Sequence, residues 1–208
     1  MEKTRASQKR DAEPLSGLIL AGGQGRRMGG RDKGLEPFAG KPLIVHVLAR
    51  LERHVDEVLI NANRNLDIYQ RQGCRVVTDR EGGFQGPLMG IWSGLMAATT
   101  PWVLVVPCDT PALPMNLVER MVKGRGDGDI ALAHDGERAH PVVALIRRSL
   151  ADDLGEALAQ GERKIDRWYA RHPFCHVDFS DCPENFANLN NVEEKALLEG
   201  RLHPQQQE

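Results

Sequence analysis

Short apolar runs alternate with longer stretches of helical spacing along most of the chain. The runs, such as WVLVV at 102–106, carry Val, Leu and Ile on consecutive positions, which predicts strands that are buried on both faces. Between them, apolar residues recur at the intervals of an amphipathic helix, as Leu43, Val47 and Leu51 do. Strands are predicted at 18–20, 57–61, 74–78, 102–106, 130–133 and 142–146. Helices are predicted at 43–53, 66–73, 87–98, 113–122, 149–160 and 192–198.

The alternation of strands and helices predicts an α/β fold. We expect a single three-layer αβα domain built on a mostly parallel, Rossmann-like sheet. At 208 residues, the chain is long enough for one domain with a substantial core. We place that domain at 15–200, between a charged leader at 1–14 and a Gln-rich tail at 201–208, and we expect both flanking segments to be disordered.

The overall charge narrows the range of partners. With 27 Lys and Arg against 29 Asp and Glu, the net charge of −2 gives no general attraction to nucleic acid or to an anionic membrane. No apolar run approaches the length of a transmembrane helix, and the charged N-terminus is unlike a secretory signal. We therefore expect a cytoplasmic protein with reduced cysteines that binds neither nucleic acid nor membrane.

Four potential metal ligands lie close together in the sequence: His172, Cys175, His176 and Cys182. Zinc accepts these ligand types, but their spacing matches no familiar zinc motif. We interpret them as ordinary strand and loop residues.

The most informative segment follows the first predicted strand. It continues as Ala-Gly-Gly at 21–23, and residues this small let backbone N–H groups approach an anion closely. Arg27 and Lys33, with two further arginines between 24 and 31, add positive charge that suits phosphate. The alternative is a strand-to-helix turn on a solvated basic surface.

Two well-known phosphate-binding motifs are excluded. Met28 occupies the position of the third glycine of G-x-G-x-x-G, and Pro42 follows Gly40-Lys41 where a Walker A motif requires Ser or Thr. The loop is therefore suited to phosphate without being a dinucleotide-binding fingerprint or a P-loop.

Polar residues follow three of the predicted strands, where ligands of open α/β sheets bind. Asp109 comes after the strand at 102–106 between two prolines, so its carboxylate is well placed to hold Mg²⁺ against phosphate oxygens. Asn61 and Asp79 follow two other strands and could hydrogen-bond a base edge or a ribose hydroxyl. The alternative for all three is a turn or a helix cap.

Three other positions are weaker candidates. Gly90 lies in Gly-Pro-Leu-Met-Gly at 86–90, which either starts a helix or lets the chain pass close to a ligand. Asn188 and Asn190 alternate, so they point to the same side of an extended segment and could contact an acceptor or a metal. His140, before the strand at 142–146, is interpreted as structural, with lining of an acceptor pocket as the alternative.

These motifs together carry a resemblance to a known family. The sequence L-A-G-G-x-x-x-R-M-G-x-x-D-K-x-L at 20–35, followed by G-K-P-L, resembles the signature of nucleotidyltransferases, and its particular form is similar to the molybdenum cofactor guanylyltransferases. The same order of motifs continues with G-P-L-x-G at 86–90, P-C-D-x-P at 107–111, a strand containing His-Pro, and N-x-N at 188–190. The resemblance covers roughly 15–198.

The resemblance implies a nucleotidyltransferase sheet and a reaction. GMP would pass from GTP to the terminal phosphate of molybdenum-bound molybdopterin, with Mg²⁺ as cofactor and pyrophosphate as leaving group. It also implies transient contact with molybdopterin-handling proteins and apo-molybdoenzymes. The implied nucleotide-binding residues are Leu20, Ala21, Gly22, Gly23, Lys33, Asn61, Asp79 and Asp109. The implied catalytic residues are Arg27, Lys33 and Asp109, with Asp109 as metal ligand and Gly90, Asn188 and Asn190 on the acceptor side.

Other functions stay open at this point. The nearest is the same chemistry with another base or acceptor, such as cytidylyl transfer to molybdopterin or nucleotidyl transfer to a sugar phosphate. A non-catalytic GTP-binding module that delivers the cofactor is a different class, but it could dispense with Asp109 and the asparagine pair.

Overall fold

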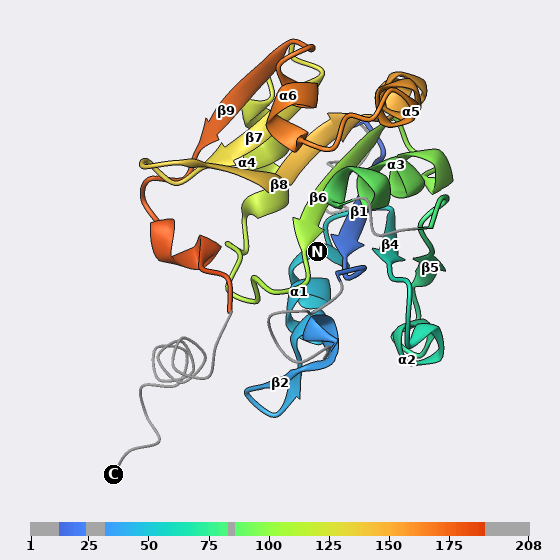
Figure 1. Cartoon of the computed structure of the whole chain (residues 1–208). Helices are drawn as coiled ribbons and strands as arrows, with labels where there is room; N and C mark the ends of the chain where they lie inside the picture. Colours follow the sequence, from blue (N-terminus) through green and yellow to red (C-terminus); the bar gives the residue numbers. More distant parts are fainter. Residues whose placement is uncertain (1–12, 24–31, 83–85, 190–208) are drawn as a thin grey trace, which may run out of the picture.

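A seven-stranded sheet forms the centre of the protein (Figure 1). The structure, a computed structural model, describes residues 13–23, 32–82 and 86–189. The strands run in the order β5-β4-β1-β6-β8-β7-β9, and β2 and β3 form a separate small hairpin. Their bounds are β1 Leu15–Leu20, β2 Pro37–Phe38, β3 Lys41–Pro42, β4 Glu57–Asn61, β5 Arg75–Val77, β6 Trp102–Pro107, β7 Ile130–His134, β8 Ala139–Arg147 and β9 Phe174–Asp178.

Helices cover both faces of the sheet, which confirms the three-layer αβα prediction. α1, α2 and α4 pack against one face, and α3, α5 and α6 pack against the other (Figure 1). The helices are α1 Leu43–Leu51, α2 Leu66–Gln70, α3 Pro87–Ala97, α4 Leu117–Gly124, α5 Ala151–Ala159 and α6 Ile165–Tyr169. Single 3₁₀ turns lie at η2 Lys33–Leu35, η3 Arg148–Leu150 and η4 Pro183–Phe186.

The central strand β6 shows why the apolar runs are continuous. Leu104 and Val106 belong to the core beneath α1 and α4, whereas Val103 and Val105 belong to the core beneath α3 and α5. All four side chains are fully buried. A strand covered on both faces must be apolar at every position, which is the pattern seen in the sequence.

Strand direction brings several chain segments to one edge of the sheet. β1 is parallel to β4 and β6, and β7 is parallel to β9. β8 runs antiparallel to both β6 and β7, so its start lies beside their carboxyl ends. The register of β7 and β8 shifts between Leu132 and Ala133, where Pro141 cannot donate a ladder hydrogen bond. The edge therefore receives the ends of six strands and the beginning of β8.

Most predicted elements are confirmed, with differences that have physical causes. The helix predicted at 113–122 begins only at Leu117, because Pro114 disfavours helical geometry in the residue before it. β9 and α6 were not predicted as elements. Glu13, placed in the expected leader, accepts hydrogen bonds from Trp102 Nε1 at 2.9 Å and Arg125 Nη2 at 2.5 Å. The predicted helix at 192–198 and the tail lie outside the described residues.

Within the part of the chain that the structure describes, no helix combines the length and the apolar character needed to cross a membrane.

A glycine in α3 sets the distance between this helix and β1. A Cβ at Gly94 would lie 2.2 Å from Leu18 Cδ2, and Leu18 is completely buried. We predict that Gly94→Val lowers the free energy of unfolding by about 1–3 kcal/mol, because the added carbons have no space. Urea denaturation would measure the loss. Gly82→Val is the control, since nothing lies within 4 Å of its Cβ position, and an equal loss there would contradict the packing explanation.

Candidate active site

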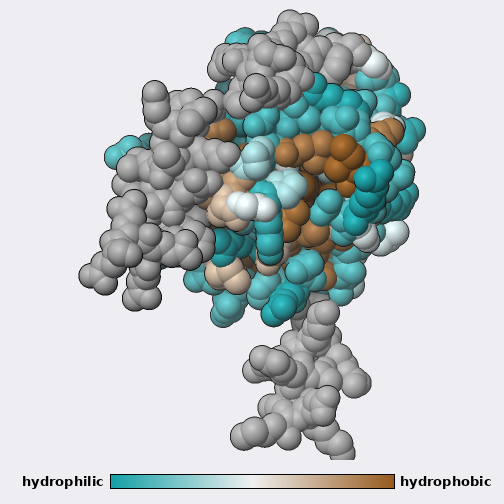
Figure 2. Space-filling view, turned by 90° about the horizontal axis from the view of Figure 1, so that it is seen from below, coloured by the Kyte–Doolittle hydropathy of each residue, from teal (hydrophilic) through white to brown (hydrophobic). Residues whose placement is uncertain are grey.

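A cavity of about 360 Å³ opens at the carboxyl edge of the sheet. Figure 2 looks at this end of the molecule from below and shows hydrophobic surface surrounded by hydrophilic residues. The cavity is lined by Leu20, Gly22, Gly23, Asn61, Asp79, Gly86, Pro87, Gly90, Pro107 and Val142. The end of β1, the end of β4 and the start of α3 thus enclose one space of a size that suits a nucleotide.

Lys33 and Asp109 form an ion pair near this cavity. Lys33 Nζ lies 2.5 Å from Asp109 Oδ2, and both side chains are largely buried. Asp109 follows β6 directly, and its backbone carbonyl accepts a hydrogen bond from Leu189 N at 2.9 Å. The pair joins the segment after the glycine-rich loop to the end of the central strand, although 76 positions separate the two residues.

The second oxygen of Asp109 has no hydrogen-bond partner among the described residues, although it is buried. Leaving a buried carboxylate oxygen unsatisfied is costly, so such an atom calls for an explanation. Carboxylate oxygen is the ligand type that Mg²⁺ prefers, and the Asp109 carboxylate therefore fits a divalent cation. The neighbouring Cys108 is buried, which raises the pKa of its thiol and keeps it from acting as a thiolate nucleophile.

A hydrogen-bond network fixes the orientation of Asn61. Its Nδ2 donates to Asp79 Oδ1 at 2.9 Å and to Val77 O at 3.3 Å, and both are acceptors only. Asn63 supports the same carboxylate, because its Nδ2 donates to Asp79 Oδ2 at 2.7 Å. The amide of Asn61 consequently cannot turn around, and its Oδ1 faces the glycines of the cavity.

Two glycines make room for that oxygen. A Cβ at Gly90 would lie 2.5 Å from Asn61 Oδ1, and a Cβ at Gly22 would lie 2.9 Å from the same atom. Any larger residue at Gly90 must therefore displace Asn61 or the helix α3. The two glycines thus let the backbone after β1 and the backbone of α3 come close to Asn61 Oδ1, at the end of β4.

The two ends of the glycine-rich loop are held by residues from the β4–α2 region. Arg64 Nη2 donates to Gly23 O at 3.2 Å, and Arg64 Nε lies 3.6 Å from Asp32 Oδ2. Asp32 also accepts hydrogen bonds from Asn65 Nδ2 at 2.9 Å and Tyr69 Oη at 2.6 Å. Burial and the contact with Asp32 raise the pKa of the Tyr69 hydroxyl, so it remains a donor. This network positions the residue that precedes Lys33.

A smaller second cavity of about 170 Å³ lies beside the first and shares Pro107 and Val142 with it. Thr110, His140 and Asn188 also line it. Thr110 Oγ1 and Asn188 Oδ1 lie 2.8 Å apart, so the segment at 188–189 is joined to the strand exit that carries Asp109.

His140, which lines the second cavity, is paired with the carboxylate of Asp135. His140 Nε2 lies 2.7 Å from Asp135 Oδ2, and the imidazole stacks on Phe186 with ring centroids 4.7 Å apart. Burial alone would raise the pKa of Asp135, but hydrogen bonds from the N–H groups of Arg138 and Glu137 and from His140 lower it to about 2. Asp135 is therefore an anion at neutral pH.

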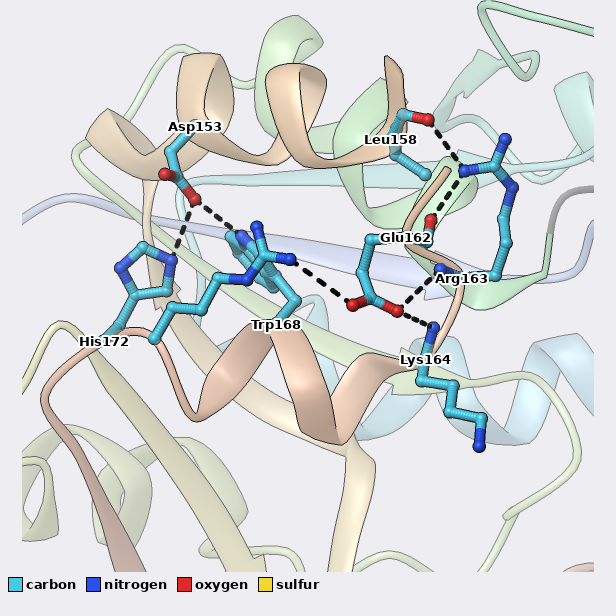
Figure 3. A network of polar contacts seen from close by, with 8 residues as sticks. Asp153, Leu158, Glu162, Arg163, Lys164, Trp168 and His172 are labelled. Atoms are coloured by element: carbon cyan, nitrogen blue, oxygen red, sulfur yellow. Dashed lines mark hydrogen bonds and ion pairs between the residues drawn. The ribbon is translucent and has the colours of Figure 1, made fainter. Parts of the chain in front are cut away.

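The cysteines and histidines weighed as zinc ligands have other contacts. His172 Nε2 lies 3.0 Å from Asp153 Oδ2, the oxygen that also accepts from Trp168 Nε1 at 2.7 Å (Figure 3). Cys175 Sγ is near the carbonyls of Gly124 and Arg125. Among the described residues there is no group of three or more His, Cys, Asp or Glu that could hold a metal ion.

Residues 17–175 match the family model of the MobA-like NTP transferase domain. The chain belongs to this family. It is 45% identical over 186 residues to the molybdenum cofactor guanylyltransferase of Shewanella sediminis. The alignment covers 88% of this chain and 95% of the relative. It is 49% identical over 180 residues to the enzyme of the same name from Mannheimia succiniciproducens, covering 86% and 95%.

Solved structures agree on the fold of this MobA-like chain. A molybdopterin-guanine dinucleotide biosynthesis protein A from Archaeoglobus fulgidus superposes with a TM-score of 0.74 over 91% of this chain and 99% of the other, at 22% sequence identity. A nucleotidyl transferase from Methanothermobacter thermautotroptrophicus gives a TM-score of 0.71 at 21% identity, covering 92% and 98%. Family and fold together make the chain a nucleotidyltransferase.

The structure brings most of the predicted site residues of this MobA-like domain to one edge. Leu20, Gly22, Gly23, Asn61 and Asp79 line the first cavity; Ala21 lies between the first two of these in the chain, and Lys33 pairs with Asp109 close by. The acceptor candidates are divided: Gly90 lines the first cavity and Asn188 the second. Arg27 and Asn190 lie outside the described residues.

Several residues of the site were not singled out from the sequence. Asn63, Arg64 and Tyr69 act on the site through Asp79 or Asp32, and Asp135 acts on His140. The alternation of Asn61 and Asn63 at a strand exit is a signal that could have indicated Asn63. The other contacts depend on tertiary distance alone.

The Asp135 pair gives a prediction about pH. A carboxylate with a depressed pKa contributes stability above its unfolded pKa of about 3.8, and the contribution is lost as pH falls toward 2. We expect Asp135→Asn to cost about 1–2 kcal/mol of unfolding free energy at pH 7 and pH 5. Urea denaturation of both proteins at pH 7, 5, 4 and 3 should show the difference shrinking below pH 4. A difference that is constant down to pH 3 would contradict the assignment.

Proposed function

We propose that the protein transfers GMP from GTP to the terminal phosphate of molybdenum-bound molybdopterin, which yields the molybdopterin guanine dinucleotide cofactor and pyrophosphate. Relatives at 45% and 49% identity, aligned over nearly their whole length, carry the name molybdenum cofactor guanylyltransferase. The observation that carries the proposal is the buried Asp109 carboxylate, paired with Lys33 through one oxygen and unpartnered through the other among the described residues.

The predicted site residues have distinct roles in this proposal. The backbone at 21–23 approaches the triphosphate, and Lys33 with Arg27 stabilises the negative charge that builds on departing pyrophosphate. Asp109 would hold Mg²⁺, which neutralises phosphate charge so that an anionic acceptor can approach an anionic donor. The acceptor phosphate is already an anion at neutral pH, so positioning rather than proton removal provides most of the rate enhancement.

The fixed amide of Asn61 supports guanine as the base. Its Oδ1 is an acceptor that cannot be exchanged for a donor, because Nδ2 is committed to Asp79 and Val77. The Watson–Crick edge of guanine carries two adjacent donors, the N1–H and the exocyclic amine, which can meet such an acceptor. Cytidylyl transfer is the second candidate, and nucleotide selectivity separates the two.

We further propose that the protein acts in the cytoplasm and meets molybdopterin-handling proteins and apo-molybdoenzymes transiently. The chemistry of the reaction supports the transient contacts, because both the acceptor and the product are cofactors that other proteins must supply and receive.

Nucleotide selectivity gives the first test of the proposal. We expect GTP with Mg²⁺ to raise the melting temperature more than CTP, ATP or UTP at equal concentration, because bound ligand stabilises the folded state. Gly90→Ala should abolish this shift by displacing Asn61 Oδ1, while the ligand-free protein melts within a few degrees of the wild type. A preference for CTP would favour the cytidylyl alternative, and an unchanged GTP shift in Gly90→Ala would contradict the role of Asn61.

Removal of the Asp109 charge gives a second test. We expect Asp109→Asn to lower turnover by about 100- to 1,000-fold or more in a pyrophosphate-release assay with GTP and molybdenum-bound molybdopterin. Lys33→Ala should have a similar effect, because it removes the partner of the same carboxylate. Asp152→Asn, on the exposed surface of α5, is the control and should be fully active. An active Asp109→Asn enzyme would refute the mechanism.

A further inference from the structure

The second cavity is lined by basic and neutral residues. Two of the residues that line it, Arg138 and His140, are basic, and none of its described lining residues is acidic. Asp135 contacts His140, and its Oδ1 accepts hydrogen bonds from the backbone N–H groups of Glu137 and Arg138. The same carboxylate pairs with Arg138, whose Nε lies 3.8 Å from Asp135 Oδ2, and Asp135 itself does not line the cavity.

Asp135 determines how the imidazole presents itself. Because Asp135 is ionised and can only accept, His140 Nε2 must carry the proton that joins the two side chains at 2.7 Å. His140 Nδ1 has no hydrogen-bond partner among the described residues. It can donate to a bound anion when both ring nitrogens carry a proton.

The ring of His140 is held firmly in this orientation. It stacks on Phe186 at an interplanar angle of 24°, and the neighbouring Pro141 accepts a hydrogen bond from Tyr169 Oη at 2.8 Å through its carbonyl. A binding group that is fixed before the ligand arrives loses little conformational entropy on binding.

The position and size of the cavity narrow the choice of anion. Thr110 lines it and follows Asp109 directly, so a group bound there lies next to the proposed reaction centre. At about 170 Å³ the cavity is below the range of whole-ligand pockets, but it has room for a phosphate group. The pterin part of an acceptor would have to lie outside it.

We propose that the second cavity binds the terminal phosphate monoester of the acceptor and that His140 Nδ1 donates a hydrogen bond to it, with Asp135 as a positioning residue. This inference rests on the proposed function, since it assigns the acceptor side of the same reaction. It gives His140 a role in acceptor binding and none in GTP binding.

Two substitutions of His140 distinguish the contributions of its two ring nitrogens. The amide of Gln reaches the position of Nε2 and can keep the contact with Asp135, whereas the shorter amide of Asn reaches the position of Nδ1 and loses that contact. We expect His140→Gln to raise the KM for molybdenum-bound molybdopterin by about 10- to 100-fold, because a charge-assisted hydrogen bond is lost. The KM for GTP and the melting temperature should stay near those of the wild type.

His140→Asn should have the opposite effects: we expect a lower melting temperature than in His140→Gln and a smaller rise in the KM for the acceptor. Asp135→Asn should raise the acceptor KM without altering the GTP-induced thermal shift. An unchanged acceptor KM in His140→Gln would overturn the inference. An equal rise in both KM values would also overturn it, because it would indicate a structural role.

A direct probe keeps the test independent of turnover. Inorganic phosphate, added to GTP-saturated protein, should shift the ring signal of His140 in carbon-13 NMR spectra, with the signal assigned by its loss in His140→Gln. A signal that does not move would argue against the anion site. If the wild type releases no pyrophosphate from GTP and the acceptor, the proposed function fails, whereas a phosphate-dependent shift would still support the cavity as an anion site.

Discussion

The ion pair between Lys33 and Asp109 is the interaction on which the candidate site depends. It connects the segment after the glycine-rich loop to the end of β6. Only one oxygen of the Asp109 carboxylate is paired in this way, and the other, buried oxygen has no hydrogen-bond partner among the described residues. A structure selected for stability alone would satisfy both oxygens, because an unmet buried charge is costly. The arrangement therefore fits our proposal that a cation and a phosphate chain bind here, with stability given up at the site.

The direction of β8 decides which residues can reach this pair. In a wholly parallel sheet only strand ends would meet at the carboxyl edge, and His140 would lie at the opposite edge as the first part of its strand. Because β8 is antiparallel to β6 and β7, its beginning lies beside Pro107 and the residues after β7. The reversed strand thus brings the imidazole of His140 to the second cavity, which Thr110 also lines and which adjoins the first.

The sequence predicts the layers of the fold and most of the first cavity, because both depend on local pattern. Continuous apolar runs indicate doubly covered strands, and residues that follow such strands fall at a common edge, which identifies Asn61, Asp79 and Asp109. Long-range side-chain partners could not be predicted in this way. The contacts of Tyr69 with Asp32 and of Asp135 with His140 depend on how loops close in space, and neither has a periodic signal.

The two cavities differ in a way that fits two substrates. The first is larger and is bordered by glycines that let backbone approach a ligand, whereas the second is small and is bordered by the polar side chains of Thr110, His140 and Asn188 among apolar residues. Pro107, at the end of β6, borders both cavities, and Asp109 and Thr110 follow it on the same strand exit. Leu189 N donates to the Asp109 carbonyl, and Asn188 contacts Thr110. A displacement reaction needs its donor and acceptor aligned on opposite sides of one phosphorus atom. If the two cavities hold the donor and the acceptor as proposed, the strand exit beside them could provide that alignment, since both cavities are built on the same sheet.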